Sequence, residues 1–358
     1  MRATITPSPV SKGRQRLMTS CAIAAGMAAL AYGGPALGQV AANPVFTSVG
    51  AGTSVNNAGN QTNVDVTQAQ SIISWVPTDT APTGGDIDVL PTGSSWNFSG
   101  SGDYTVLNRF VNGGGGALSR QIALNGTVNS VDTATSGQRG GNIWFYNAGG
   151  ILIGATGVIN VGSLVLTSND IITTGGLFGP GGEIRFDGAA GSTSAITVNG
   201  TINTNIAINP GNSYVALVAP RVVQAGTVRT DGSVAYVAAE AVDIRINSGL
   251  FDISVTRGAE GGNAITHTGT TTGPAHQQGD IDQSRIYMVA IPKNDAVTML
   301  VSGAIGYDDA LSAQVDPDGA VRLSAGYNVV GGEVAAAPAN ATAANITAGD
   351  TLFRSDTV

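Results

Sequence analysis

Charge, aromatic rings and thiols are all scarce in this sequence. Charged residues make up 11% of the 358 residues, aromatic residues make up 5%, and there is a single cysteine. So few charges exclude a disordered polyelectrolyte, and one thiol cannot form a disulfide within the chain. Glycine is abundant, with 51 residues, but it does not recur at every third position, which excludes collagen.

Helical periodicity is also missing. No stretch longer than a few residues repeats its apolar residues at about every 3.6 positions, and the best helical candidate, Ser233–Ala241, is short and lacks capping residues. Glycine, threonine, asparagine, valine and isoleucine dominate instead, and these residues are typical of short strands joined by tight turns. The sequence therefore predicts an all-β protein.

The first 38 residues predict a secretory signal peptide. A basic segment precedes the apolar run Cys21–Tyr32, and small residues follow up to Gly38. This run has 12 residues, whereas a membrane-spanning helix needs about 20. We therefore expect cleavage between Gly38 and Gln39, with sites after Ala41 or Ala42 left open, and no transmembrane span in the mature chain.

Removal of this segment would change the charge and the chemistry of the chain. It takes away the only cysteine and four of the 16 basic residues but none of the 24 acidic ones, so 12 basic residues remain and Lys293 is the only lysine. Without a thiol the mature chain has no disulfide and no thiolate metal site. A net charge near −12 repels a phosphate backbone, so nucleic acid is a poor candidate partner.

A short phrase recurs along the mature chain. It consists of glycine, one variable residue, valine or isoleucine and then usually asparagine, and it begins at Gly126, Gly157, Gly200, Gly226 and, more weakly, Gly303. Short strands that recur in this way predict a solenoid, because one coil cannot bury its own apolar face and stacked coils form a continuous core. We attribute the glycine and asparagine to corners that need left-handed backbone angles. A sandwich or barrel would explain the alternating strands but not the phrase, so a parallel β-helix is favoured.

Two further strands begin at glycine, at Gly141 and Gly182, and alternate in polarity. Alternate side chains of a strand point to opposite faces of a sheet. We therefore expect Phe145 and Phe186 to point into the core of the coil, with Trp144 on the outer face.

Three segments depart from the coil pattern. Asn43–Gly102 predicts an N-terminal cap, Thr256–Ser284 predicts a long excursion from the coil, and Ala335–Asn345 is of low complexity. Two interpretations of the outward Trp144 and Tyr146 stay open: they dock a partner, or the Thr256–Ser284 excursion covers them.

Several segments follow one another in the order found in one known family. They resemble the two-partner secretion domain at the front of the filamentous haemagglutinin family, and the resemblance covers roughly residues 55–245. The segments that carry it are Ile72–Trp75, Thr105–Arg109, Ala123–Val128, Asn147–Gly154, Val161–Thr167 and Ala219–Gly226.

The resemblance implies a right-handed parallel β-helix with an N-terminal β cap and extra-helical hairpins, extending over residues 39–300. Residues 301–358 would be further coils or the low-complexity start of a longer passenger. The implied partner is an outer-membrane β-barrel transporter with periplasmic docking domains, which moves the chain from the periplasm to the cell surface or the medium. Such exoproteins act mostly as adhesins, with a surface glycan or another receptor as a further partner.

The resemblance also suggests which residues the transporter recognises. They lie in two places: Asn108 and Arg109 end one strand, and Asn147, Gly150 and Ile151 belong to a turn. The two residues between Asn147 and Gly150 differ from the proline and asparagine of the family. At each of the five positions a purely structural role, as a strand end or a corner, is the alternative.

Catalytic and metal-binding patterns are thin. His267 and His276 lie in a segment rich in glycine and threonine, and Asp316–Gly319 lacks the downstream glutamate of a calcium loop. One lysine and scattered arginines disfavour a polysaccharide lyase on a β-helix. We therefore expect no enzyme, no metal and no cofactor. The alternatives are a β-helical enzyme acting on polysaccharides and a structural protein of a surface layer or matrix.

Overall fold

The computed structural model describes residues 45–49, 52–79, 84–135, 137–204, 213–247, 250–273, 285–294 and 297–306, together with five short strands between residues 312 and 354. The predicted signal segment with its cleavage site at Gly38 and Gln39 lies outside the described residues, as do His276 and the turn at 316–319.

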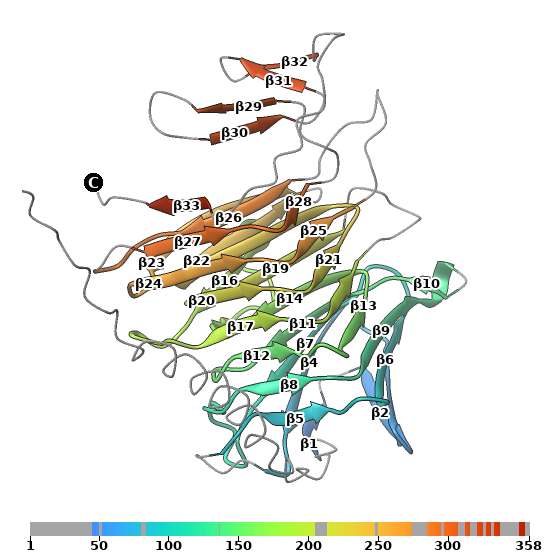
Figure 1. Cartoon of the computed structure of the whole chain (residues 1–358). Coiled ribbons are helices and arrows are strands. Elements are labelled where there is room, and N and C mark those ends of the chain that lie inside the picture. The colour runs from blue at the N-terminus through green and yellow to red at the C-terminus, as the bar shows by residue number, and fades with distance from the viewer. Residues whose placement is uncertain are drawn as a thin grey trace, which may run out of the picture. The chain divides into compact units, whose positions relative to one another are not determined.

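The chain winds through three sheets, which we name sheets A, B and C (Figure 1). Each coil gives one strand to sheet A, then one to sheet C and then one to sheet B, and consecutive coils pair in parallel in all three sheets. The predicted all-β parallel β-helix is thereby confirmed. The seven coils of the described part of the chain are β4 (Gln70–Val76), β5 (Ile87–Leu90), β6 (Ser95–Gly100); β7 (Thr105–Phe110), β8 (Ile122–Leu124), β9 (Thr127–Asp132); β11 (Asn142–Tyr146), β12 (Ile151–Ile153), β13 (Val158–Asn160); β14 (Ser163–Thr167), β17 (Ala195–Val198), β18 (Thr201–Asn203); β19 (Tyr214–Ala219), β20 (Arg221–Gln224), β21 (Thr227–Arg229); β22 (Ser233–Asn247), β24 (Gly262–His267), β25 (Thr270–Thr272); and β26 (Ile286–Ala290), β27 (Val297–Val301), β28 (Ala304–Ile305).

The interior of the coils is a continuous apolar column. Phe145 of β11 is fully buried and lies in register with Leu166 of β14, which lies in register with Leu217 of β19. Near the N-terminal end, the rings of Trp75 and Trp96 stack with centroids 4.9 Å apart. Full burial of one such side chain contributes about 1.5 to 3 kcal/mol, so the column is a main source of stability. The predicted inward position of Phe145 is confirmed.

The glycines of the recurring phrase allow the coils to approach each other closely. A Cβ atom at Gly126, Gly157, Gly200 or Gly226 would lie only 2.1 to 2.4 Å from a carbonyl oxygen of the preceding coil. None of these four glycines has a positive φ angle, so the expected left-handed backbone is wrong here, and lack of space is the physical reason for glycine. The asparagines of the phrase lie inside strands β9, β13 and β18 and not at corners.

Antiparallel strands form the N-terminal cap. β1 (Val45–Val49) pairs with β4, and β2 (Thr53–Ala58) pairs with β3 (Gln61–Val66), which pairs in parallel with β6. These strands cover the free edges of β4 and β6 in the first coil. The predicted cap exists, but it is shorter than expected, because Gln70–Gly100 already forms a coil.

A second layer of antiparallel strands covers the outer face of sheet A. In this outer layer β15 (Asp170–Ile171) pairs with β16 (Glu183–Asp187), β16 pairs with the second half of β22, and β22 pairs with β23 (Leu250–Gly258). Residues 233–238 of β22 pair in parallel with β19 and β26 in sheet A. One strand of 15 residues therefore belongs to two sheets.

The structure corrects two sequence-based expectations. The excursion predicted at Thr256–Ser284 is wrong for residues 262–272, because β24 and β25 are ordinary coil strands there; residues 274–284 lie outside the described residues. The strand with Phe186 pairs in the outer layer, and Phe186 packs against the outer face of sheet A and not inside the coil. Alternation of polarity is the same in a coil strand and in a half-buried antiparallel strand, so the pattern alone did not distinguish them. The best helical candidate, Ser233–Ala241, lies in β22 and is extended.

The remaining elements extend the coils locally. β10 (Gln138–Arg139) forms a hairpin with β9, and η1 (Thr133–Thr135) and η2 (Pro180–Gly182) are single turns. Near the C-terminus, β33 pairs antiparallel with β27, and the other strands pair as two hairpins. A search of the described residues for helices that are long and apolar enough to cross a membrane finds none. The C-terminal strands are β29 (Ser312–Val315), β30 (Val321–Ser324), β31 (Tyr327–Val330), β32 (Glu333–Ala336) and β33 (Thr351–Arg354).

Candidate functional site

The predicted turn forms a corner between sheets A and C. Asn147 follows β11 and is fully buried, and its Nδ2 donates to the carbonyl oxygens of Gly150 at 2.7 Å and Arg120 at 2.9 Å. The first bond closes the turn, and the second joins it to the preceding coil. Its Oδ1 is buried without a hydrogen-bond partner. The side chain of Asn147 therefore links two consecutive coils by hydrogen bonds.

Gly150 and Ile151 complete this corner. Gly150 has a φ of +96°, and a Cβ there would lie 2.5 Å from the carbonyl oxygen of Ala195 in the next coil. Both the backbone angle and the lack of space require glycine. Ile151 is fully buried at the start of β12, in register with Ile122 and Ile196. The structure thus brings together the three predicted turn residues.

The corner is tied to the N-terminal part of the chain through Arg120. The guanidinium of Arg120 contacts a carboxylate oxygen of Asp79 at 2.8 Å, and its Nε donates to the carbonyl oxygen of Gly85 at 3.0 Å. The backbone carbonyl of Arg120 also accepts the hydrogen bond from Asn147 Nδ2. Arg120 therefore contacts both the turn and the loop after β4.

Asn108 points into the coil. It is fully buried, its Oδ1 accepts a hydrogen bond from Trp75 Nε1 at 3.0 Å, and its Nδ2 donates to the carbonyl oxygen of Trp144 at 3.1 Å. The side chain therefore joins three consecutive coils. In the folded domain no partner can reach it from outside.

Arg109 points to the outer face of sheet A and is the one predicted recognition residue that solvent reaches. Its side chain is 22% exposed, its Nη2 lies 2.6 Å from both carboxylate oxygens of Asp170, and its guanidinium lies 5.2 Å from the centre of the Tyr146 ring. Burial raises the pKa of Asp170, and Arg109 opposes this rise. Burial also raises the pKa of Tyr146 to about 12. Arg109 thus fastens β15 to sheet A.

The outward aromatic residues are covered. Trp144 is 0% exposed, donates from Nε1 to the hydroxyl of Tyr214 at 3.0 Å, and meets the ring of Phe178 edge-on at 5.3 Å. Tyr146 is also buried in the cluster between sheet A and the outer layer. Of the two open interpretations, the folded structure supports cover, which residues 170–187 and 239–258 supply.

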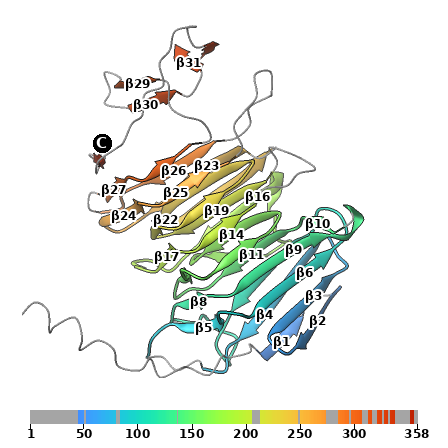
Figure 2. The ribbon, with the colours of Figure 1, turned by 45° about the vertical axis from the view of Figure 1, so that its right-hand side comes forward.

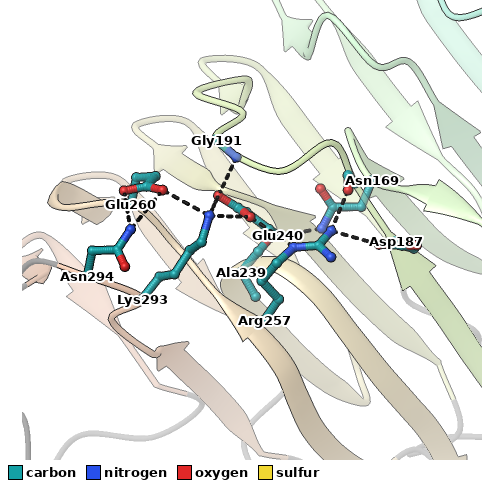
Figure 3. Close-up of polar contacts among 10 residues, drawn as sticks. Asn169, Asp187, Gly191, Ala239, Glu240, Arg257, Glu260, Lys293 and Asn294 are labelled. Atoms are coloured by element: carbon teal, nitrogen blue, oxygen red, sulfur yellow. Dashed lines mark hydrogen bonds and ion pairs between the residues drawn. The ribbon is translucent and has the colours of Figure 1, made fainter.

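Sequence reasoning missed a buried acidic centre at the edge of the outer layer (Figure 3). Glu240 is 0% exposed, and its carboxylate lies 2.9 Å from Arg257 Nε, 3.2 Å from Lys293 Nζ and 2.9 Å from the backbone nitrogen of Gly191. It lies at the irregularity where β22 changes sheets. A lone glutamate within an apolar strand was the available signal.

Sequence reasoning also missed a row of asparagines on the outer face of sheet B. Asn63, Asn97, Asn129, Asn160 and Asn203 are hydrogen-bonded to one another in sequence, one from each of five neighbouring strands. We name this row the asparagine ladder. The asparagine of the recurring phrase was its signal in the sequence, but it was assigned to corners.

The histidine that the structure describes lies between coils. His267 is buried, with Nδ1 2.8 Å from the carbonyl oxygen of Ser302 and Nε2 2.8 Å from the hydroxyl of Thr271. Burial lowers its pKa. In the described part of the chain, no three side chains of His, Cys, Asp or Glu gather as a metal site would require.

No protein-family model matches the chain, and no curated protein matches its sequence. Among solved structures it is similar to the HMW1 secretion domain from Haemophilus influenzae, with 18% identity and a TM-score of 0.48 over 72% of this chain and 64% of that one. It is also similar to a filamentous hemagglutinin secretion domain, with 14% identity and a TM-score of 0.40 over 74% of this chain and 99% of that one. The chain thus spans somewhat less than two thirds of the HMW1 domain. Both of these solved structures are of secretion domains.

Proposed function

We propose that residues 39–300 form a two-partner secretion domain that opens a surface or secreted exoprotein. The mature chain is recognised in the periplasm by an outer-membrane β-barrel transporter with periplasmic docking domains and then moved outward. Residues 301–358 begin the passenger. Following the family resemblance, the exoprotein is a non-enzymatic adhesin whose receptor is a surface glycan or another surface molecule.

The observation that carries the proposal is the place of the resembling segments in the fold. Thr105–Arg109 lies in β7, Asn147–Gly154 spans the corner and β12, and Val161–Thr167 spans β14. β7, β11 and β14 are neighbours in sheet A. The ordered motifs of the sequence therefore fall on consecutive coils, as one recognition region would require.

Burial of four of the five predicted recognition residues supports recognition of the turn before the coil closes. Asn108, Asn147, Gly150 and Ile151 are enclosed in the folded coil, and only Arg109 is accessible. We infer that the transporter reads the turn before the coil closes, while the chain is unfolded. Arg109 is then the residue through which a folded domain would be recognised.

The test compares two matched asparagines. Asn147 and Asn169 are both fully buried, both donate from Nδ2 to a carbonyl oxygen, and both have an Oδ1 without a partner. Asn169 lies outside the motif. Replacement of either by alanine removes buried hydrogen bonds at a cost of about 1 to 3 kcal/mol. With the partner barrel present, Asn147→Ala should accumulate in the periplasm, whereas Asn169→Ala should reach the medium.

Equal secretion of the two variants would contradict a recognition role for Asn147 and would leave it a corner residue. The variant Arg109→Ala distinguishes recognition of the folded surface from recognition of the unfolded turn. If secretion stops with Arg109→Ala but not with Asn147→Ala, the transporter reads the folded surface and not the unfolded turn.

A further inference from the structure

The asparagine ladder repeats one hydrogen-bonding unit from strand to strand. Nδ2 of each asparagine donates to Oδ1 of its neighbour on the N-terminal side, at 3.1 Å for Asn97 to Asn63, 3.0 Å for Asn129 to Asn97, 3.2 Å for Asn160 to Asn129 and 3.0 Å for Asn203 to Asn160. All five residues are half-buried on the outer face of sheet B. The ladder therefore faces solvent.

Each rung keeps hydrogen-bonding capacity that the ladder does not use. A carboxamide has two N–H donors and an oxygen with two lone pairs, and a ladder bond uses one donor and one lone pair. Asn129 and Asn160 each make one such donated and one such accepted bond, so one N–H and one lone pair of each side chain remain unused. Neighbouring strands are about 4.8 Å apart, so this donor–acceptor pair recurs at that interval along the stack.

The ladder forms the floor of an open groove. A hollow of about 690 Å³ lies over β3, β6, β9 and β13, with Asn63, Asn97, Asn129 and Asn160 along it. Arg139 of the β10 hairpin and Asp65 of β3 also line it, so the groove holds one charge of each sign. Figure 2 shows β3, β6 and β9 side by side, with β10 next to β9. From Asn63 to Asn160 the groove runs for roughly 14 Å.

We propose that this groove binds an extended, uncharged glycan that lies along the axis of the stack. A sugar hydroxyl both donates and accepts, as each rung does. A linear polymer along the axis meets the same donor and acceptor at each coil. A polyanion is disfavoured because the mature chain has 12 basic and 24 acidic residues, and an apolar ligand would leave the unused N–H group and lone pair of each rung unpaired. The proposal names a site for the glycan receptor of the proposed adhesin, but it does not depend on the route of secretion.

The experiment uses the mature chain, residues 39–358, in folded form. Cellotetraose, maltotetraose and chitotetraose are titrated by calorimetry, with a heparin tetrasaccharide as the polyanionic comparison. We expect at least one neutral tetrasaccharide to bind with a Kd of about 1 mM or tighter and the heparin fragment to bind at least tenfold more weakly.

Two ladder variants locate the site. Asn129→Ala lies in the groove, whereas Asn203→Ala removes the last rung, which does not line the groove. Thermal denaturation first establishes that both variants fold. Asn129→Ala should weaken binding at least tenfold and Asn203→Ala less than twofold.

Three results would overturn the proposal: no neutral tetrasaccharide binds, the heparin fragment binds more tightly, or the two variants lose affinity equally. Loss of secretion by Asn129→Ala without any glycan binding would instead make this face a docking surface for the transporter. Because the titration uses purified protein, its failure leaves the secretion proposal untouched, and the Asn147 and Asn169 comparison tests that proposal separately.

Discussion

At the scale of single residues, asparagine serves two purposes in this β-helix, and the direction of the side chain decides which. Asn108 and Asn147 point inward or into a corner and satisfy backbone carbonyls of neighbouring coils. Asn129 and Asn160 point outward and bond to each other. An amide is suited to both settings because it donates and accepts at once. The same residue type therefore builds both the candidate recognition corner and the groove.

The carboxylate of Glu240 stabilises the fold through two ion pairs. Its buried carboxylate meets Arg257 and Lys293, which are 32% and 26% exposed. Removal of one partner of a buried ion pair costs about 3 to 5 kcal/mol, and the partial exposure of the two cations lowers this range. We predict that Glu240→Gln lowers the free energy of unfolding by about 2 kcal/mol, measured by urea denaturation.

The matched control for Glu240 is Glu260, which also contacts Lys293, at 2.9 Å, but lies at the surface. Glu260→Gln should leave the urea midpoint unchanged. If both variants unfold at the wild-type midpoint, Glu240 does not hold the outer layer in place.

At the scale of elements, the coil and the outer layer are separate apolar clusters that share sheet A. Phe145 belongs to the coil interior and Phe186 to the outer layer. An aspartate at either position would bury an unpaired charge at a cost of several kcal/mol. We predict that Phe145→Asp unfolds the β-helix, whereas Phe186→Asp opens the outer layer and leaves the coils paired.

Limited proteolysis with mass spectrometry distinguishes the two results for the phenylalanine variants. Phe186→Asp should expose cleavage sites within 170–187 and 239–258 while the remaining coils stay resistant. Phe145→Leu and Phe186→Leu are controls that keep the apolar character. Uniform cleavage of Phe186→Asp over the whole chain would show that the two clusters unfold as one unit.

The sequence was sufficient to predict the coils but not the outer layer. The recurring phrase is local and predicts parallel stacking wherever it occurs. The strand after Gly182 has the same alternation as the strand after Gly141, yet Ile184 pairs with Ile244, 60 residues further on. Such pairing depends on distant partners and leaves no local signal. For the same reason the burial of Trp144 and the partners of Glu240 could not be predicted, although Phe145 could.

At the scale of the whole molecule, acid should loosen the C-terminal coils through His267. Ser302 offers a carbonyl oxygen, so Nδ1–H donates to it, and in the neutral ring Nε2 accepts from the hydroxyl of Thr271. Burial lowers the pKa of His267 in the folded state below its ordinary value near 6.5. The unfolded chain then binds more protons below about pH 6.5, so stability is complete above this pH and falls as the pH drops, by at most about 1.4 kcal/mol per pH unit.

Urea denaturation of the wild type and of His267→Gln, at pH values from 7.5 to about 5, measures this effect. Glutamine keeps a donor and an acceptor but does not titrate, so the variant should lose less stability on acidification. Parallel curves for the two proteins would mean that carboxylates and not His267 set the acid response.

The double membership of β22 has a consequence for the order in which the chain takes its shape. If the chain leaves the cell from its N-terminus, each coil pairs with the coil that emerged before it. β16 pairs with β15 on one edge, but it gains its partner on the other edge only when β22 follows. Until then the outer face of sheet A lacks the part of its cover that the second half of β22 and β23 supply. While the roughly 60 residues between β16 and the second half of β22 emerge, apolar surface of sheet A is exposed. A chain halted within this interval should therefore aggregate or be degraded, whereas a chain halted after β23 should persist. The order in which the strands pair therefore constrains the timing of export as well as its destination.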